Sequence, residues 1–338
     1  MIIVAILKHV AGKSADYGAA LDYLKYEHDE VLKKPLLDAN GNWVLRRDIL
    51  LEGINCEPEL FDVECEMLNA QYHKNQNYDE IKTHHYLISF DPADKDECGL
   101  TGEQAQAIGM EYVKANFPGH QALVCTHMDG HNGSGNIHVH IVINSLRKLD
   151  VPQQPFMERP IDCKAGYKHH LTKDYLKHLQ QSLMNICLRE NLNKVDLLSP
   201  SVNKITQQEY YAKQRGQINL DKLNAELVAE GLTPMKTKFQ TEKDKLRDAI
   251  TAAAKKAKSF EEFCRLLQTE SSILVKDHRG RFSYLLPDRE KYISARTLGT
   301  SFDREHLLTL FESNAITAAK EKQQWGVADP IAVLYIKS

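Results

Sequence analysis

The sequence predicts an α/β protein with an antiparallel central sheet covered by helices, followed by a smaller module of helices and a β-hairpin. Three observations predict this fold class. Short apolar, strand-like segments alternate with helical segments as far as about residue 150. A Gly-rich turn reverses the chain between two of these strands. Beyond that point the sequence changes to long, charge-rich helical segments.

Local signals predict each element of the first part. Residues 1–10 are typical of a buried strand, and residues 14–31 are typical of a helix capped by Ser14. An Asn-Gly turn lies within residues 38–43. The remaining elements, in order, are a strand over 44–54, a helix over 58–74 with Pro58 in its first turn, a strand over 84–91, a helix over 102–117, and strands over 120–129 and 137–144.

The second part contains two segments that are typical of linkers, LLSPSVNK at 197–204 and GLTPMKTK at 231–238. Residues 271–288 predict a β-hairpin, because two strand-like flanks enclose a short polar turn. We therefore expect an α/β domain over residues 1–195 and a helical and hairpin module over residues 196–338.

Composition limits the setting and the kind of partner. The formal net charge of −3 and the pI near 6.6 argue against attraction of nucleic acid to the whole surface, so DNA contacts would come from local patches. No apolar run reaches the roughly 18 residues of a membrane span, and the N-terminus lacks signal-peptide features. We expect a cytoplasmic protein without membrane insertion. Its seven cysteines include no C-x-x-C pair and are expected to be reduced thiols.

Four histidines and an aspartate crowd around the Gly-rich turn in THMDGHNGSGNIHVHIVINS, residues 126–145. Alternate side chains of a strand share a face, so His138 and His140 point away from the aliphatic face of their strand. His127 ends the preceding strand and lies beside them if the two strands pair antiparallel. Three imidazoles that converge from two strands are a facial ligand set for a divalent metal, with positions open for water and substrate oxygens.

A less specific interpretation of this cluster exists. A lone histidine on a sheet is more often a hydrogen-bonded core or surface residue, but three histidines on facing strands would fill a core poorly. His131 lies inside the turn and is expected to be exposed to solvent. Asp129 is expected to orient a ligand histidine, and its alternative role is to cap the turn.

These residues resemble a known family. H-x-D, a short loop, H-x-H, an aliphatic run and Asn together are similar to the three-histidine motif of conjugative relaxases, which are single-strand DNA endonucleases of the HUH class. The similarity is greatest to MobP-type relaxases of Gram-positive integrative conjugative elements, and it extends in motif order over roughly residues 1–190. It implies that His127, His138 and His140 bind the metal, expected to be Mg²⁺ or Mn²⁺, and that Ser89 helps to seat the DNA.

The family's first motif supplies a tyrosine near the N-terminus, and DYLKYEHDE offers Tyr23 and Tyr26. If residues 14–31 are helical, Tyr17 belongs to the apolar stripe of the helix and is expected in the core, whereas the other two tyrosines face elsewhere. The resemblance favours Tyr23 as the nucleophile, with Tyr26 as the alternative. Either ring could instead pack as a partly buried aromatic at the sheet edge.

The resemblance implies transesterification, in which a tyrosine oxygen attacks a DNA phosphodiester and a 5′-phosphotyrosine forms while the metal neutralises phosphate charge. The implied partners are single-stranded and hairpin DNA at a transfer origin, with accessory DNA-binding and coupling proteins of a conjugation system. Candidate DNA contacts are Arg147 and the basic, tyrosine-containing segment 159–178, with Lys168 and Lys173. The alternative for that segment is a solvated helix face.

Two other classes of function stay open. A three-histidine metal hydrolase would use the metal to activate water, but the sequence lacks H-E-x-x-H and a general-base glutamate beside the cluster. A non-catalytic DNA-binding protein could keep the same fold. Formation of a denaturation-resistant adduct with single-stranded origin DNA would distinguish a relaxase from both.

Overall fold

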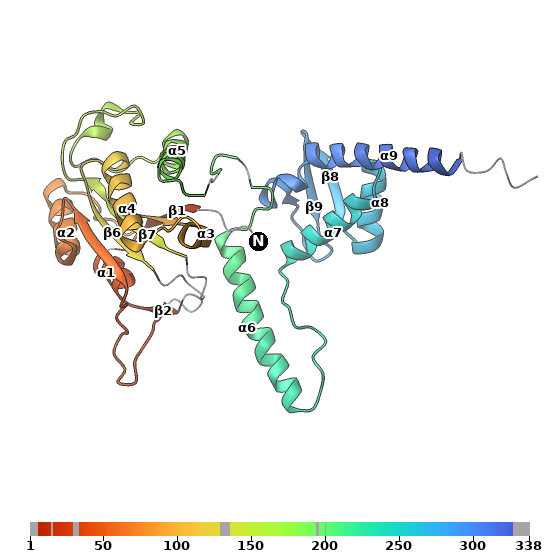
Figure 1. Cartoon of the computed structure of the whole chain (residues 1–338), viewed down its shortest axis with the longest axis horizontal. Coiled ribbons are helices and arrows are strands. Elements are labelled where there is room, and N and C mark those ends of the chain that lie inside the picture. The colour runs from red at the N-terminus through yellow and green to blue at the C-terminus, as the bar shows by residue number, and fades with distance from the viewer. Residues whose placement is uncertain are drawn as a thin grey trace, which may run out of the picture. The chain divides into compact units, whose positions relative to one another are not determined.

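The structure is a computed structural model, and it describes residues 6–14, 16–29, 34–128, 136–193, 196–199 and 201–326. The chain divides into two compact units, Met1–Ser199 and Pro200–Ser338 (Figure 1). The sequence placed the boundary between residues 195 and 196. Within the described ranges, no helix has the length and apolar content that crossing a membrane requires.

Unit 1 is built on a five-stranded antiparallel sheet with the strand order β1-β5-β7-β6-β4. Every residue of β6 and β7 is buried, because these strands occupy the interior of the sheet and both of its faces are covered. The sheet confirms the predicted fold class. Its strands are β1 (Ile6–Gly12), β4 (Ile49–Ile54), β5 (Thr83–Ser89), β6 (His120–His127) and β7 (His138–Arg147).

Two apolar cores lie on opposite faces of this sheet. Alternate residues of β7 enter different cores: Val139 and Ile141 pack with α4 and α5, whereas Val142 packs with α1 and α2. The predicted aliphatic face of β7 is therefore confirmed. The helices of unit 1 are α1 (Gly18–Lys25), α2 (Phe61–Tyr72, preceded by a short 3₁₀ turn, Pro58–Leu60), α3 (Pro92–Asp96), α4 (Gly102–Asn116) and α5 (Lys173–Arg189).

Helix α4 packs closely against the two central strands. It begins with a capping box in which the side chains of Thr101 and Gln104 each accept a hydrogen bond from the other's backbone N–H. At Gly109, an added Cβ would come within 2.6 Å of Val139 Cγ1 and 2.9 Å of Val124 Cγ1. The absence of a side chain there lets the helix approach the strands that carry the histidines.

Strand β1 is an edge strand and not the buried strand that its apolar sequence predicted. Within the described residues its one partner strand is β5. Ile6 and Val10 are 51% and 46% exposed, because no other strand in the described part of the chain covers them on the outer side. Residues 1–5 of the predicted strand lie outside the described residues.

Helix α1 also differs from its prediction, since it begins at Gly18 with Tyr17 at the N-cap position. Ser14 does not cap it. The Ser14 hydroxyl accepts a hydrogen bond from the backbone N–H of Asp16, and the Asp16 carboxylate accepts one from the N–H of Ala19. Asp16 therefore supplies the acceptor for the first turn of the helix, two residues later than predicted.

Unit 2 combines a three-stranded sheet, of order β10-β9-β8, with helices around one core. The predicted hairpin is present. Its turn residues Arg279 and Gly280 have φ values of 53° and 72°, as a two-residue hairpin turn requires. The elements are α6 (Gln207–Ala229), α7 (Glu242–Lys256), α8 (Phe260–Ser271), β8 (Leu274–His278), β9 (Arg281–Leu285), β10 (Ile293–Ser294) and α9 (Arg304–Gly326).

Candidate metal centre and active site

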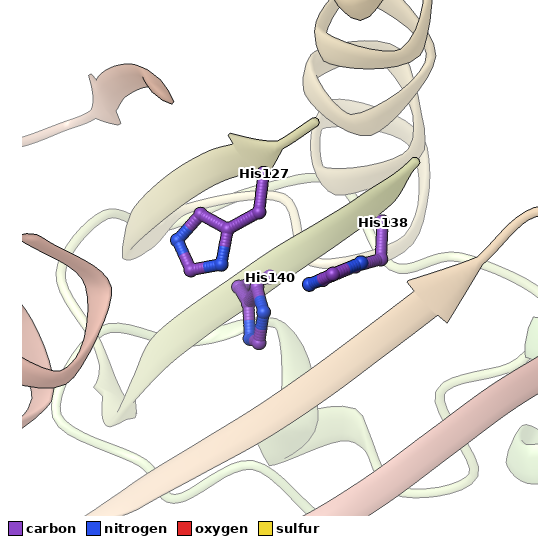
Figure 2. A group of neighbouring side chains, drawn as sticks. All are labelled: His127, His138 and His140. Carbon is purple, nitrogen blue, oxygen red and sulfur yellow. The ribbon is translucent and has the colours of Figure 1, made fainter. Parts of the chain in front are cut away.

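The three histidines that the sequence predicted to converge lie together at one end of the sheet in unit 1. His127 ends β6 and pairs directly with His138, which begins β7, and His140 lies two residues further on the same face. One nitrogen of each ring lies within 4.8 Å of one nitrogen of each other ring, and all three side chains are buried (Figure 2). Strand alternation and antiparallel pairing are enough to form this cluster.

Backbone carbonyl groups orient two of the rings. His127 Nε2 lies 2.9 Å from the carbonyl oxygen of Leu24, and His138 Nδ1 lies 3.2 Å from that of Asn136. A carbonyl oxygen can only accept, so these two ring nitrogens carry the protons and donate. The nitrogen that each ring offers to a metal is then the other one, which is Nδ1 of His127 and Nε2 of His138.

The third ring is oriented by His85 on β5, a residue that is not among those predicted from the sequence. His85 Nε2 lies 2.9 Å from His140 Nδ1. Burial, with a smaller effect of the Lys8 charge, lowers the pKa of His85 to about 4, so this imidazole is neutral near pH 7 and can accept the His140 proton. His140 Nε2 then faces the cluster. The period-two spacing of His85 and Ser89 on one strand was the signal that could have identified it.

Tyr23 lies beside the cluster. Its ring centroid is 5.7 Å from that of His140, 5.9 Å from that of His85 and 5.3 Å from that of His28. Helix α1 holds it there, because the carbonyl group of the next residue, Leu24, is the one that accepts from His127. The candidate nucleophile and a candidate ligand are thus positioned by the same helix end.

The other two N-terminal tyrosines are engaged elsewhere. Tyr26 packs edge-on against Trp43, with ring centroids 5.4 Å apart. Tyr17 is 2% exposed, which confirms its predicted place in the core, and Asn69 donates a hydrogen bond to its hydroxyl at 2.7 Å. Burial raises the pKa of Tyr17 to about 12, so its phenol is both inaccessible and hard to ionise. The role of Tyr23 stays a prediction that this geometry supports.

The remaining residues of the predicted site are partly described. Ser89 ends β5, pairs with His138, and accepts a hydrogen bond from Asn136 Nδ2 at 3.0 Å, so it lies at the same end of the sheet as the cluster. Its predicted contact with DNA stays a prediction. Asp129 and His131 lie outside the described residues.

Arg147 is buried, so the structure gives no support to the expectation that it contacts DNA, which stays a prediction. The residue is 3% exposed, and its Nε donates to the backbone carbonyl group of Asp162 at 2.9 Å. Burial lowers the pKa of its guanidinium. Strand β7 has ten residues, so Arg147 lies about 30 Å from the histidine end. The turn at Pro160–Cys163 covers that end of the strand.

The segment 159–178 is not a free basic track, because acidic side chains pair with most of its lysine and arginine residues. Lys168 Nζ lies 2.7 Å from a carboxylate oxygen of Glu80, and its backbone pairs with Leu146 near the far end of β7. Arg159, Lys164 and Lys177 pair with Asp162, Asp150 and Asp174. Lys173 is exposed at the start of α5. DNA contacts by Lys168 and Lys173 stay predictions, but the paired charges weaken the reason for them.

Comparison with known proteins adds independent information. Residues 43–154 match the family model described as relaxase, MobA/VirD2-like, nuclease domain, and this stretch contains all three histidines but not Tyr23. Relatives include two proteins of Staphylococcus aureus named Protein rlx. One is 25% identical over 263 residues, or 78% of this chain and 68% of the relative, and the other is 24% identical over 78% and 64%. The matches span about two thirds of the relatives' own lengths.

Solved structures with some similarity are complexes of the conjugative relaxase TrwC with oriT DNA. The metal-bound form has 13% sequence identity and a TM-score of 0.32, covering 93% of this chain and 99% of that one. The copper-bound form has 12% identity and a TM-score of 0.33, with the same coverage. Similarity at this level does not establish a shared fold.

Proposed function

We propose that the protein is a relaxase that nicks one DNA strand at a transfer origin in conjugative transfer or mobilization, since residues 43–154 match the MobA/VirD2-like relaxase nuclease family model. One observation carries the proposal. The three buried histidines form a cluster suited to a divalent metal, and Tyr23 lies beside it. A metal site adjacent to a tyrosine suits nucleophilic attack on a phosphodiester.

The donor set fits a divalent metal ion. Three imidazoles fixed by outer hydrogen bonds leave coordination positions for phosphate oxygens and water. Of the two ions expected from the sequence, Mn²⁺ suits nitrogen ligands better than Mg²⁺, which loses its water reluctantly and prefers oxygen. Later transition metals bind imidazole more tightly still, so the ion used in the cell depends on availability. When bound, the ion supplies positive charge to the phosphate oxygens.

The residues of this chain account for the geometry of the reaction. Helix α1 presents Tyr23 to the cluster, so its phenolic oxygen attacks a phosphorus atom held there. A bond forms between the tyrosine oxygen and phosphorus, and the bond from phosphorus to the DNA 3′ oxygen breaks. The phenol gives up its proton to solvent, and the departing 3′ oxygen takes one up. Since one phosphodiester replaces another, the reverse reaction rejoins the strand.

Single-stranded and hairpin DNA at the origin are the proposed substrates, and accessory DNA-binding and coupling proteins of a conjugation system are the proposed partners. We assign to unit 2 a supporting role in DNA binding. Its hairpin exposes Arg279 in the turn and Arg281 at the start of β9, and both can contact phosphates without reading the base sequence.

Covalent adduct formation tests the proposal. The full chain is incubated with labelled single-stranded origin DNA and Mn²⁺, denatured, and separated by electrophoresis. A relaxase gives a band in which DNA stays attached to protein, and chelation of the metal beforehand removes this band. Cleaved DNA without an adduct would identify a metal hydrolase, and intact DNA bound only before denaturation would identify a non-catalytic binding protein. Either result contradicts the proposal.

A further inference from the structure

The segment between α1 and β4 forms a small ribbon with an apolar face. Strand β2 (His28–Asp29) pairs with β3 (Lys34–Pro35), and single bridges join Tyr26 to Leu45 and Leu37 to Trp43. Antiparallel partners share a face of a ribbon, as do residues two apart on one strand. The four bridge residues therefore lie on one face, which we call the Trp43 face: Tyr26, Leu37, Trp43 and Leu45.

The Trp43 face is open to solvent. Trp43 is 46% exposed, Leu37 is 59% exposed and Leu45 is 55% exposed. Tyr26 meets the indole of Trp43 edge-on, with an interplanar angle of 81°, so the two rings do not cover each other's faces by stacking. Figure 1 shows the ribbon extending from the sheet beside β2. A contiguous exposed apolar patch of this kind marks an interaction site more often than a chance arrangement.

The ribbon is fixed to the active site. Tyr26 follows Tyr23 by three residues, less than one helical turn. Arg46 ties the ribbon to the end of α1, because its backbone N–H donates to Lys25 at 2.9 Å and its Nε donates to the carbonyl oxygen of Tyr26 at 3.1 Å. The carbonyl group of Leu24, the residue before Lys25, accepts a hydrogen bond from His127. The end of α1 thus holds the three-histidine cluster, Tyr23 and the Trp43 face in one local arrangement.

We propose that the Trp43 face binds bases of single-stranded DNA next to the cleaved phosphate, with the Trp43 indole stacked on one base; this inference rests on the proposed function. Unpaired bases present flat apolar faces, and proteins that hold single strands stack aromatic side chains on them. Exposed Arg47 follows Leu45 by two residues and can contact phosphates. A strand held at the histidines and continuing past Tyr26 meets this surface within a few nucleotides.

Tryptophan fluorescence provides a direct readout. The chain has two tryptophans, Trp43 and Trp325, so the Trp325→Phe variant leaves Trp43 as the sole indole. Full-length Trp325→Phe protein is titrated with oligo(dT), and with a blunt dA·dT duplex as the control. Stacking predicts that oligo(dT) quenches the emission in parallel with the binding seen by anisotropy of labelled oligo(dT). The duplex, whose bases are already stacked, leaves the emission nearly unchanged.

Substitutions test the energetic part of the inference. Base stacking on an aromatic residue corresponds to roughly a 5- to 150-fold change in affinity. We expect Trp43→Ala to weaken oligo(dT) binding within this range, and Trp43→Phe, which keeps a ring, to weaken it less. Tyr78→Ala is the matched control, because Tyr78 is a 91% exposed aromatic residue in the segment before β5, at the sheet end opposite the histidines. The Tyr78→Ala variant should bind oligo(dT) with the affinity of the unaltered chain.

The outcomes separate this inference from the proposed function. Circular dichroism melting first establishes that Trp43→Ala and Trp43→Phe are folded. Suppose that the unaltered chain forms the covalent adduct, that Trp43→Ala binds oligo(dT) as tightly as the unaltered chain does, and that oligo(dT) does not quench the Trp43 emission of Trp325→Phe. The inference is then wrong, and the proposed function stands. Such a result would assign the Trp43 face to a protein partner. If the unaltered chain neither binds oligo(dT) nor forms an adduct with origin DNA, the proposed function itself is contradicted.

Discussion

The position of one proton on each imidazole decides whether the three histidines can bind a metal. Leu24 and Asn136 accept from His127 and His138 through carbonyl oxygens, which fixes the protonated nitrogen of each ring. The sequence could predict that these rings meet, since alternation and strand pairing are local properties. It could not predict their outer partners, because Leu24 lies 103 residues from His127 along the chain and reaches it only through packing of α1.

Removing one of the three clustered histidines should abolish the metal-dependent reaction. In His140→Ala, two imidazoles remain where three hold the ion, so we expect the covalent adduct to be lost and the affinity for Mn²⁺ to fall by at least about tenfold. Calorimetric titration with Mn²⁺ measures the affinity, and His178→Ala on α5 is the matched control, because His178 is exposed. Undiminished Mn²⁺ affinity in a folded His140→Ala protein would contradict the metal site.

His85 should act as a positioning residue through His140. Partners that orient a metal-bound histidine contribute about 10- to 100-fold to metal affinity, so His85→Ala should weaken Mn²⁺ binding within that range. His85→Gln retains an acceptor and should recover part of the loss. The comparison of the two variants by calorimetry excludes a simple packing effect. Equal affinity in His85→Ala and the unaltered chain would show that His140 is oriented without His85.

Strands β5 and β6 carry different chemistry on their two faces, and the face opposite the three-histidine cluster also buries histidines. His84 and His120 are 5% and 0% exposed. Burial is the main cause that lowers the pKa of each to about 3, reinforced by nearby positive charge. Both rings are therefore neutral in the folded protein at pH 5, whereas an unfolded histidine with a pKa near 6.5 is protonated.

This difference predicts acid sensitivity of unit 1. The unfolded state binds more protons, so the free energy of unfolding falls as pH drops below about 6.5, by up to about 1.4 kcal/mol per pH unit for each ring. Urea unfolding followed by Trp43 fluorescence in Trp325→Phe, at pH 7, 6 and 5, measures this slope. His84→Asn should make it shallower. A free energy of unfolding that is constant from pH 7 to 5 would refute the prediction.

The elements also show where prediction from sequence ends. Strands β6 and β7 were predictable because period-two alternation and a short Gly-rich turn are local signals. The burial of Arg147 was not, since it depends on the turn at Pro160–Cys163 folding over the strand end. Likewise Lys168 meets Glu80, which is 88 residues away in the sequence. Basic residues indicate a DNA surface only when their acidic partners are known.

At the scale of the whole molecule, unit 1 contains every residue proposed for cleavage and has its own apolar cores. We therefore predict that a chain ending at Ser199 folds cooperatively and still forms the adduct with single-stranded origin DNA. Its affinity for hairpin origin DNA should fall, because it lacks the exposed arginines of the unit 2 hairpin. Circular dichroism and the adduct assay check this expectation. A soluble, folded but inert product would mean that unit 2 completes the catalytic site.

The identity of the attacking residue decides whether Tyr23 is the nucleophile beside the three-histidine cluster. The covalent adduct is digested with protease and nuclease, and the peptide that retains a nucleotide is sequenced by mass spectrometry. We predict a phosphotyrosine link at Tyr23, whose ring lies 5.7 Å from His140, and no adduct from a folded Tyr23→Phe protein that still binds DNA. Tyr26→Phe, which alters a ring packed on Trp43, should form the adduct. A nucleotide found on Tyr26, or on no tyrosine, would contradict the claim.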